Sequence, residues 1–314
     1  MLVVVALGGN ALLKRGEPLT AQAQDVALAR AAVLLAGIVT EGHQLVITHG
    51  NGPQVGLLAL QSAAGPAISA LPLDVLGAES EGWIGYATER ALRNALPQEA
   101  VVVTLLAQTL VDPHDEAFAH PTKPIGPTYN EPTAKALAER NKWSVAIDGT
   151  FWRRVVASPK PIGVIELDSI KRLVESGAIV ICAGGGGIPV YRDANKKLFG
   201  VEAVIDKDST SGLLATQMDA DLFIMLTDVA GVYMGYGTDR ARIIATASPA
   251  ALLKDASSFG TGSMGPKVTA ACQFVSTTGK HAAIGALDDL AEIIVGNKGT
   301  IVRLDSEDFS FRVA

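Results

Sequence analysis

The 314-residue chain has little cysteine, and nothing in it resembles a metal or disulfide scaffold. Cys182 and Cys272 are far apart and lack C-x-x-C spacing, so neither a disulfide framework nor a structural zinc site is expected. We predict that both are buried thiols in a reducing compartment. The five histidines show no i, i+4 pair of the kind that binds metals, and no metal-binding residue is predicted.

Positive charge and long apolar runs are also scarce. The 26 Lys and Arg against 32 Asp and Glu give a net charge of −6, and no five basic residues run together, which argues against a nucleic-acid partner. The longest stretch without polar side chains is 178–190, shorter than the roughly 18 residues that span a bilayer, so no membrane partner is expected. The segment after Met1 lacks a basic n-region and a signal-peptide core, and a cytoplasmic location is predicted.

Several catalytic motifs are missing. There is no G-x-x-x-x-G-K-[ST], no G-x-G-x-x-G after a strand, no G-x-S-x-G and no H-E-x-x-H. These absences argue against a Walker-type ATPase, a dinucleotide oxidoreductase, a serine hydrolase of that kind and a zincin.

The apolar residues form segments of two kinds that alternate along the chain. Short β-branched runs alternate with longer helical patterns, which is typical of a parallel sheet in a layered α/β fold. Helical spacing of Ala27, Ala31, Leu34 and Ile38 before Gly42 predicts a βαβ unit between the first two strands, and similar patterns before Gly177 and Gly279 predict further helices. The predicted strands are 2–7, 44–48, 101–105, 178–182, 222–226 and 281–285.

The stretch 112–161 differs from the rest of the chain. It holds seven prolines together with Trp143 and Trp152, and it lacks a long apolar period. We predict a protruding subdomain or lid here. No repeat of solenoid length is present.

Two glycine loops follow predicted strands. The first, Gly8-Gly9-Asn10, fits a tight turn and an anion site equally well. The second begins at His49 and continues through Gly50, Asn51, Gly52 and Pro53 into a predicted helix. The carboxyl ends of parallel strands share one edge of a sheet, so both loops are expected to line a ligand site there. His49 has no acidic or nucleophilic neighbour in sequence and is predicted to be a hydrogen-bonding loop residue rather than a base.

A third loop, 184–187, consists of four consecutive glycines. Ordering each of them costs up to roughly 1 kcal/mol relative to alanine, which makes a purely structural role strained. We therefore expect this loop to contact a ligand.

Three lysines lie beside turn residues: Lys123, Lys207 and Lys267. A lysine ammonium is a compact charge suited to gathering phosphate oxygens, and phosphoryl transfer depends mainly on positioning and charge neutralisation. Asp206 and Asp208 flank Lys207 at the start of a helical pattern, so either one fits the N-cap while the other faces the site. A carboxylate among lysines stays ionised and can hold them in place.

Six segments, in order along the chain, resemble the carbamate kinases of the amino acid kinase family: 5–12, 48–54, 121–127, 183–189, 203–208 and 262–267. The resemblance implies a three-layer αβα sandwich on a mainly parallel open sheet, with a small protruding subdomain at about 112–161. It places the phosphoryl-acceptor (carbamate) site in an N-terminal lobe, 1–200, and the ATP/ADP site in a C-terminal lobe, 201–314.

The resemblance also implies a reaction. ATP and carbamate give ADP and carbamoyl phosphate, reversibly and by direct in-line transfer, with Mg²⁺ as cofactor. A cytoplasmic homodimer with a role in arginine metabolism is implied as well.

Residue roles follow from the matching motifs. Other amino acid kinases often carry a lysine where this chain has Ala6, whereas in carbamate kinases a subdomain lysine, matched by Lys123, supplies that charge. The implied catalytic residues are Lys123, Lys207, Asp208 and Lys267. The implied substrate-binding residues are Gly8, Gly9, Asn10, Gly50, Asn51, Gly52, Gly185 and Gly186. The implied nucleotide-binding residues are Lys207, Thr227, Asp228, Val232, Tyr233, Met264, Gly265 and Lys267.

The segment 208–214 departs from the resemblance, because relatives tend to carry more aliphatic and alanine residues there. Gly212 in this predicted helix costs roughly 1 kcal/mol of helix stability, although no predicted contact depends on it.

Two other functions stay open at this stage. A related enzyme of the same fold could phosphorylate another small carboxylate or carbamate, but Gly9, Asn10, Gly50 and Asn51 leave little room and no arginine fork for a long dicarboxylate. A nucleotide-sensing protein without turnover would have no need of the three lysines together.

Overall fold

The computed structural model describes residues 1–12, 20–64, 70–259, 264–306 and 308–312. The helices are α1 (Gly9–Leu12), α2 (Ala21–Thr40), α3 (Gly52–Ala64), α4 (Leu73–Ala95), α5 (Glu131–Asn141), α6 (Leu167–Glu175), α7 (Lys207–Gln217), α8 (Pro249–Lys254), α9 (Met264–Thr278) and α10 (Leu290–Ile294). The strands are β1 (Leu2–Leu7), β2 (Gln44–His49), β3 (Val102–Leu105), β4 (Gln108–Val111), β5 (Lys123–Tyr129), β6 (Ser144–Asp148), β7 (Phe151–Val156), β8 (Pro161–Val164), β9 (Ile179–Cys182), β10 (Ile188–Arg192), β11 (Leu198–Gly200), β12 (Leu222–Thr227), β13 (Tyr233–Met234), β14 (Arg242–Ala247), β15 (His281–Ala286), β16 (Thr300–Val302) and β17 (Ser310–Phe311).

The main sheet has its reversal of strand order at β1. Its order is β13-β14-β16-β15-β12-β1-β2-β9-β3, and β17 pairs with β14. The pairs from β15 through β12, β1, β2 and β9 to β3 are all parallel, while β16 runs antiparallel to β15. Because β2, β9 and β3, which all precede residue 183, lie on one side of β1, and the strands that follow residue 221 lie on the other, the carboxyl end of β1 is where an open sheet of this kind binds ligands.

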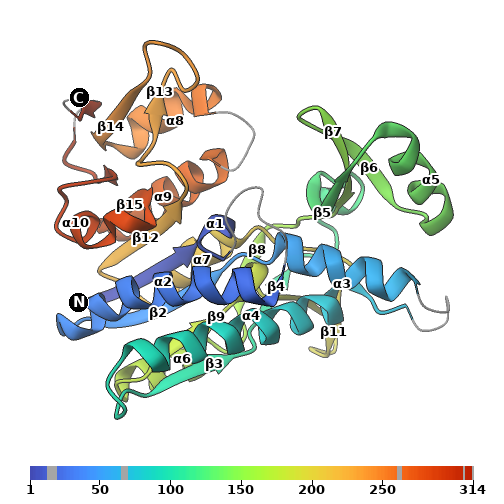
Figure 1. The fold of residues 1–314 in the computed structure, drawn as a ribbon, viewed down its shortest axis with the longest axis horizontal. Helices are drawn as coiled ribbons and strands as arrows, with labels where there is room; N and C mark the ends of the chain where they lie inside the picture. Colours follow the sequence, from blue (N-terminus) through green and yellow to red (C-terminus); the bar gives the residue numbers. More distant parts are fainter. Residues whose placement is uncertain (13–19, 65–69, 260–263, 307, 313–314) are drawn as a thin grey trace.

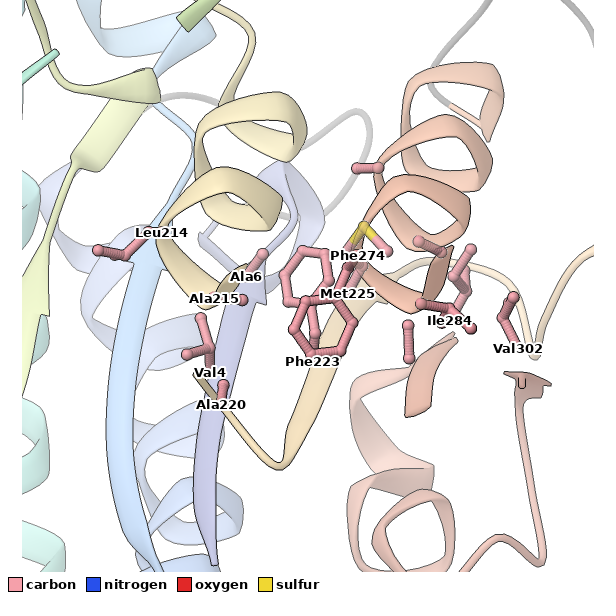
Figure 2. Packing of buried hydrophobic residues seen from close by; sticks show 14 of the residues in the cluster. Val4, Ala6, Leu214, Ala215, Ala220, Phe223, Met225, Phe274, Ile284 and Val302 are labelled. Carbon is pink, nitrogen blue, oxygen red and sulfur yellow. The ribbon is translucent and has the colours of Figure 1, made fainter. Parts of the chain in front are cut away.

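Alternating side chains of β1 enter two cores, one on each face of the sheet. Val4 and Ala6 belong to the core covered by α6, α7, α8 and α9, and Val3 and Val5 belong to the core covered by α2, α4 and α10. Figure 2 shows the first core, where Phe223 of β12 meets the helix side. All of these side chains are fully buried, and burial of one the size of phenylalanine contributes about 1.5–3 kcal/mol. The predicted layered α/β sandwich is confirmed.

Helix α2 covers the sheet as predicted, but its buried face is shifted from the predicted one. Ala31 and Ile38 are buried, whereas Ala27 and Leu34 are only half-buried and Leu28 and Leu35 take the inner positions. By length and composition alone α2 is apolar enough to cross a membrane, with a mean hydropathy of 1.5 over its most apolar window. Core helices of globular proteins pass the same test, and α2 packs against α4, β2 and α10.

Two smaller sheets flank the main one. Strands β5, β7 and β6 form an antiparallel sheet that stands away from the main sheet together with α5, at the upper right of Figure 1. We call β5–β7 with α5, residues 123–156, the arm. It is shorter than the predicted subdomain of about 112–161, because Pro161 begins β8, which joins β4, β10 and β11 in a separate four-stranded sheet. The boundary between lobes at 200 and 201 stays a prediction.

The other sequence predictions for local structure agree with the structure. The six predicted strands correspond to β1, β2, β3, β9, β12 and β15, and α6 and α9 end before Gly177 and Gly279, which both have positive φ. Cys182 and Cys272 are buried free thiols.

Candidate functional site

The first glycine turn lies against the end of the neighbouring strand. A methyl group built on Gly8 would come within 2.5 Å of the Leu226 carbonyl oxygen and 3.7 Å of the Thr227 Cα atom, so only glycine lets β1 and β12 approach this closely here. The second turn is joined to the first, since the Gly50 N–H donates to the Leu7 carbonyl at 3.1 Å. The predicted acceptor-side loop and the start of the predicted nucleotide-binding stretch therefore meet at the carboxyl edge.

Lys207 lies beside the second turn, which also approaches the first. A methyl group on Gly50 would be 3.3 Å from the Lys207 Cδ atom and 3.8 Å from the Gly9 backbone nitrogen. The side chain of Asn10, also predicted to bind substrate, is outside the described part of the structure. Gly52 begins α3, with no atom within 4 Å of a methyl group built on it, and the structure gives it no contact with the lysines.

The first turn of α7 holds two of the three predicted lysines through one carboxylate. Asp208 is 4% exposed, and its two oxygens lie 2.6 Å from Lys207 Nζ and 3.1 Å from Lys267 Nζ. Lys267 comes from α9, which packs against α7. The structure thus brings Lys207, Asp208 and Lys267 together, as predicted, and we call these three residues the helix cluster.

Lys123 reaches the same turn from the arm. Its Nζ lies 2.6 Å from Asp206 Oδ2, while Asp206 Oδ1 accepts the N–H groups of Asp208 and Ser209 at 3.0 Å. Asp206 is therefore both the N-cap of α7 and the partner of the arm lysine. Of the two roles open to the flanking aspartates, capping belongs to Asp206 and the link between the other two lysines belongs to Asp208.

Burial and neighbouring charges shift the pKa values of two groups in this cluster. Burial disfavours the charge on Asp206, but Lys123 outweighs burial, with help from Lys207, and holds the pKa of Asp206 well below its usual range. Burial lowers the pKa of Lys267, and the nearby Lys207 lowers it further. The three ammonium groups outnumber the two carboxylates, which leaves an excess of positive charge suited to phosphate oxygens.

The four-glycine loop has a structural reason at each position. A methyl group on Gly184, Gly185, Gly186 or Gly187 would come within about 2.0–2.6 Å of the His49 ring, the Asn51 amide, the Ile205 carbonyl or the Thr109 hydroxyl, respectively. All four glycines are buried, and the last three have positive φ. Contrary to expectation, these glycines need no ligand to explain them, because close packing requires them. Substrate contact by Gly185 and Gly186 stays a prediction.

The polar residues of α7 that depart from the family pattern are all used. Thr210 Oγ1 donates to the Gly186 carbonyl at 3.0 Å, and Ser211 Oγ lies 2.6 Å from Thr48 Oγ1 of β2. Gly212 faces α9, where a methyl group would be 3.3 Å from the Ala270 Cβ atom. The sequence indicated the helix cost of Gly212 but not these contacts, which join residues far apart in the chain.

His49 is the last residue of β2 rather than a loop residue, and it is fully buried. Its Nδ1 lies 3.1 Å from the Gly50 carbonyl, and burial lowers its pKa to about 4. So low a pKa makes the ring a weak base, and its contact with the Gly50 carbonyl agrees with the predicted hydrogen-bonding role.

The predicted nucleotide-binding residues are less closely grouped. Thr227 ends β12 half-buried, Asp228 is exposed, and Tyr233 is half-buried with its ring against Tyr236. Met264 and Gly265 open α9 near Lys267 and are half-buried.

Val232 does not fit the predicted nucleotide contact. Its side chain is fully buried in the core, its N–H donates to Thr300 Oγ1, and its carbonyl accepts the Ile244 N–H. No group of Val232 is exposed, and its two hydrogen bonds hold the chain at the start of β13.

Two buried polar residues of α4 were missed by the sequence analysis. Ser80 is fully buried and Glu81 is 1% exposed. Ser80 accepts a hydrogen bond from Asn51, and Glu81 accepts one from the Gly184 N–H. Adjacent polar residues within an amphipathic helix gave no motif to find.

Within the described ranges, no group of three or more His, Cys, Asp or Glu side chains is placed to hold a metal. Asp206 and Asp208 are already paired with lysines. The described residues therefore do not form a resident Mg²⁺ cage.

Comparison with known proteins places this geometry in a family. Residues 1–285 match the model of the amino acid kinase family. The chain belongs to that family. It is 51% identical over 311 residues to a carbamate kinase of Haemophilus influenzae, covering 99% of each chain, and 50% identical over 315 residues to one of Rhizobium meliloti, covering 100% of this chain and 96% of the relative. Among solved structures, a carbamate kinase from Giardia lamblia bound to AMP-PNP superposes with a TM-score of 0.88 at 40% identity, over 97% of this chain and 98% of that one. The family resemblance inferred from the six segments is confirmed.

Proposed function

We propose that the protein is a carbamate kinase, which transfers a phosphoryl group between ATP and carbamate to give ADP and carbamoyl phosphate. The observation that carries this proposal is the Lys123–Asp206 ion pair, at 2.6 Å. It brings a lysine of the arm to the turn that holds Lys207, in a chain whose first strand has Ala6 at the position of the usual lysine. Close full-length similarity to carbamate kinases supports the same activity.

Transfer is direct and in line. The three lysines neutralise the charge of the transferring phosphoryl group, and backbone N–H groups at the glycine turns contribute further donors. Asp208 holds Lys207 and Lys267 at a fixed separation. His49 is fully buried, and burial raises the pKa of the Cys182 thiol far above neutrality, so neither is suited to form a phosphoenzyme.

Mg²⁺ enters as part of the nucleotide substrate. This cation is commonly held by substrate phosphates with few protein ligands, which agrees with the lysine-paired carboxylates near α7. When bound with the nucleotide, it supplies charge neutralisation at the phosphates.

The predicted residue roles and biological setting form part of the proposal. The glycine turns and Asn51 face the acceptor, and β12, β13 and the start of α9 face the nucleotide. A cytoplasmic homodimer that acts in arginine metabolism completes the proposal.

The test is ATP formation from carbamoyl phosphate and ADP by the purified protein. We expect Mg²⁺-dependent ATP synthesis and no phosphorylated residue by mass spectrometry during turnover. ATP consumption with another small carboxylate, but not with carbamate, would favour the related enzyme. ADP binding without turnover of either acceptor would favour the nucleotide sensor. A phosphorylated histidine or aspartate would rule out direct transfer.

A further inference from the structure

We propose that Ser80 and Glu81, adjacent residues of α4, are positioning residues that set the geometry of the acceptor side. Neither carries charge to the lysine cluster. Each is instead hydrogen-bonded to a loop that the proposed function assigns to carbamate and carbamoyl phosphate. The inference rests on that proposed function and adds two residues to it.

Glu81 connects the ends of two strands through hydrogen bonds to their backbones. Its Oε1 accepts the Gly184 N–H at 2.9 Å, and both oxygens lie 3.3 Å from the Ala107 nitrogen. Gly184 follows β9 and Ala107 follows β3, so one side chain fixes the chain where two neighbouring strands leave the sheet. Both oxygens of a carboxyl group keep a lone pair that can accept a hydrogen bond, even when the group is protonated. A glutamine offers one acceptor oxygen, and its amide nitrogen, which cannot accept, would face a backbone donor.

Ser80 orients the Asn51 side chain. Asn51 Nδ2 donates to Ser80 Oγ at 2.8 Å, and Ser80 Oγ donates to the Gly77 carbonyl at 2.8 Å, so the serine hydroxyl is fixed in direction. On its other side the Asn51 amide meets the glycine loop, where a methyl group on Gly185 would be 2.0 Å from Nδ2. The amide is thus held between α4 and the loop, with 6% of Asn51 exposed.

The two contacts converge on one loop. Glu81 holds the Gly184 backbone, and Ser80 holds the Asn51 amide that packs on Gly185. A shift of either side chain moves both predicted acceptor-side groups together. Since catalytic groups displaced by about 1 Å lose rates of order 100-fold, these buried hydrogen bonds control acceptor binding without touching the acceptor.

The same helix provides matched controls two turns further on. Thr88 is also a buried hydroxyl residue, but it donates only within α4, to the Ile84 carbonyl at 2.8 Å. Glu89 is a second carboxylate that accepts a backbone N–H, from Thr104 at 3.0 Å. Thr88→Val and Glu89→Gln therefore remove comparable groups that hold no predicted acceptor loop.

The experiment compares steady-state kinetics of Ser80→Ala and Glu81→Gln with those two controls. We expect Ser80→Ala to raise the KM for carbamoyl phosphate about 10-fold, and Glu81→Gln to lower kcat/KM for carbamoyl phosphate about 10- to 100-fold. In both variants the KM for ADP should stay within about 2-fold of wild type, and Thr88→Val and Glu89→Gln should leave both constants within about 2-fold.

Other outcomes separate this inference from the proposed function. If the wild type makes ATP but Ser80→Ala keeps the wild-type KM for carbamoyl phosphate, the positioning inference is overturned while the activity stands. Equal weakening for both substrates in Ser80→Ala and in Thr88→Val would show a general structural role and would also overturn it. If Glu81→Gln does not fold, Ser80→Ala, which removes a single oxygen atom, decides the question. A wild type with no activity toward carbamoyl phosphate would overturn the proposed function and this inference with it.

Discussion

The helix cluster and the arm bring lysines to the same turn in different ways. Lys207 and Lys267 project from packed helices, and their side chains are 13% and 5% exposed. Lys123 is 24% exposed and begins a strand of the arm, which buries few apolar side chains. Those buried in the arm are Ile125, Ala134, Val155 and Val156.

The difference shows how preorganisation is divided between the two regions. The helix cluster is fixed by the cores on which α7 and α9 pack, whereas the arm is positioned by a few specific contacts. One contact is the Lys123–Asp206 pair, and another is the close approach of Gly56 in α3 to Gly126 in β5. Both regions contact the first turn of α7, because their lysines pair with Asp206 and Asp208, which are two residues apart.

The largest effect on turnover is expected from substitution of the lysines of the helix cluster. Lys207→Met and Lys267→Met should each lower kcat by roughly 100-fold or more, because losing one charge contact to a developing oxyanion commonly costs about 3 kcal/mol. Methionine keeps most of the aliphatic stem, and Asp208 keeps one lysine partner in each variant. The measurement is single-substrate kinetics with circular dichroism as the control for folding. Near wild-type turnover in a folded variant would show that the substituted lysine of the helix cluster has no catalytic role.

Removing the lysine of the arm should affect one substrate more than the other. Lys123→Ala should weaken carbamoyl phosphate binding about 10- to 100-fold and leave ADP affinity nearly unchanged, because only the acceptor side loses a charge-assisted hydrogen bond. Steady-state kinetics together with isothermal titration of ADP would measure this, with the exposed Lys160→Ala as the matched control. Unaltered carbamoyl phosphate kinetics would remove the main reason for choosing a carbamate kinase.

The partner of that lysine allows a sharper comparison. Asp206→Asn keeps a side-chain oxygen for the N-cap of α7 but removes the charge that faces Lys123. We expect a smaller change in the same direction as Lys123→Ala, about 10-fold in the KM for carbamoyl phosphate, with little change in thermal stability. A large loss of stability would instead mean that the cap fails in the asparagine variant.

The junction of the arm with α3 should respond to one added methyl group. On Gly56 this group would lie 2.0 Å from the Gly126 Cα atom, so Gly56→Ala must displace β5, at a cost of about 1–3 kcal/mol. We expect a severalfold higher KM for carbamoyl phosphate and a lower melting temperature. Gly37→Ala in α2 is the control, because nothing lies within 4 Å of its added methyl group, and it should be neutral or stabilising. Wild-type kinetics in Gly56→Ala would show that this junction does not position the arm.

The smallest predicted effect is on the pH dependence of stability. Burial raises the pKa of Glu81 to about 8, so the folded protein binds a proton that the unfolded chain releases above pH 4.5, and its contribution to stability falls as pH rises toward 8. Neutral burial of His49, with a pKa of about 4, opposes this only below pH 6.5. Glu166 and Cys182 also face Glu81, and the Cys182 thiol stays protonated in this range.

Between pH 6.5 and 8, urea unfolding of the wild type should therefore lose up to about 2 kcal/mol that Glu81→Gln does not lose. Parallel pH profiles of the two proteins would show that the Glu81 carboxyl is ionised throughout this range, contrary to the prediction.

The sequence predicted the sheet well, because six apolar runs correspond to real strands and the glycine turns follow them. It also predicted the lysine cluster through the family resemblance. The packing role of the four glycines was missed, since their neighbours His49, Asn51, Ile205 and Thr109 are distant in sequence and their crowding becomes evident only in three dimensions. Ser80 and Glu81 were missed for the same reason, because what makes them notable is their burial against loops far along the chain.

The extent of the arm was only partly predictable. Prolines marked 112–161 as different, but strand pairing divides this stretch, and the last of these residues joins β4 rather than the arm. Pairing partners of short antiparallel strands are not encoded in composition.

Full burial of Ala6 limits how such an enzyme can be converted into a relative whose first strand carries the lysine. Ala6 belongs to the same core as Leu214, Ala215 and Met225, and Figure 2 shows them around the end of β1. Ala6→Lys alone would force an ammonium group and its stem into this space, so the substitution is expected to destabilise the protein before it offers a new phosphate ligand. A viable mutational path between the two arrangements must first make room on α7, and Lys123 can be lost only afterwards.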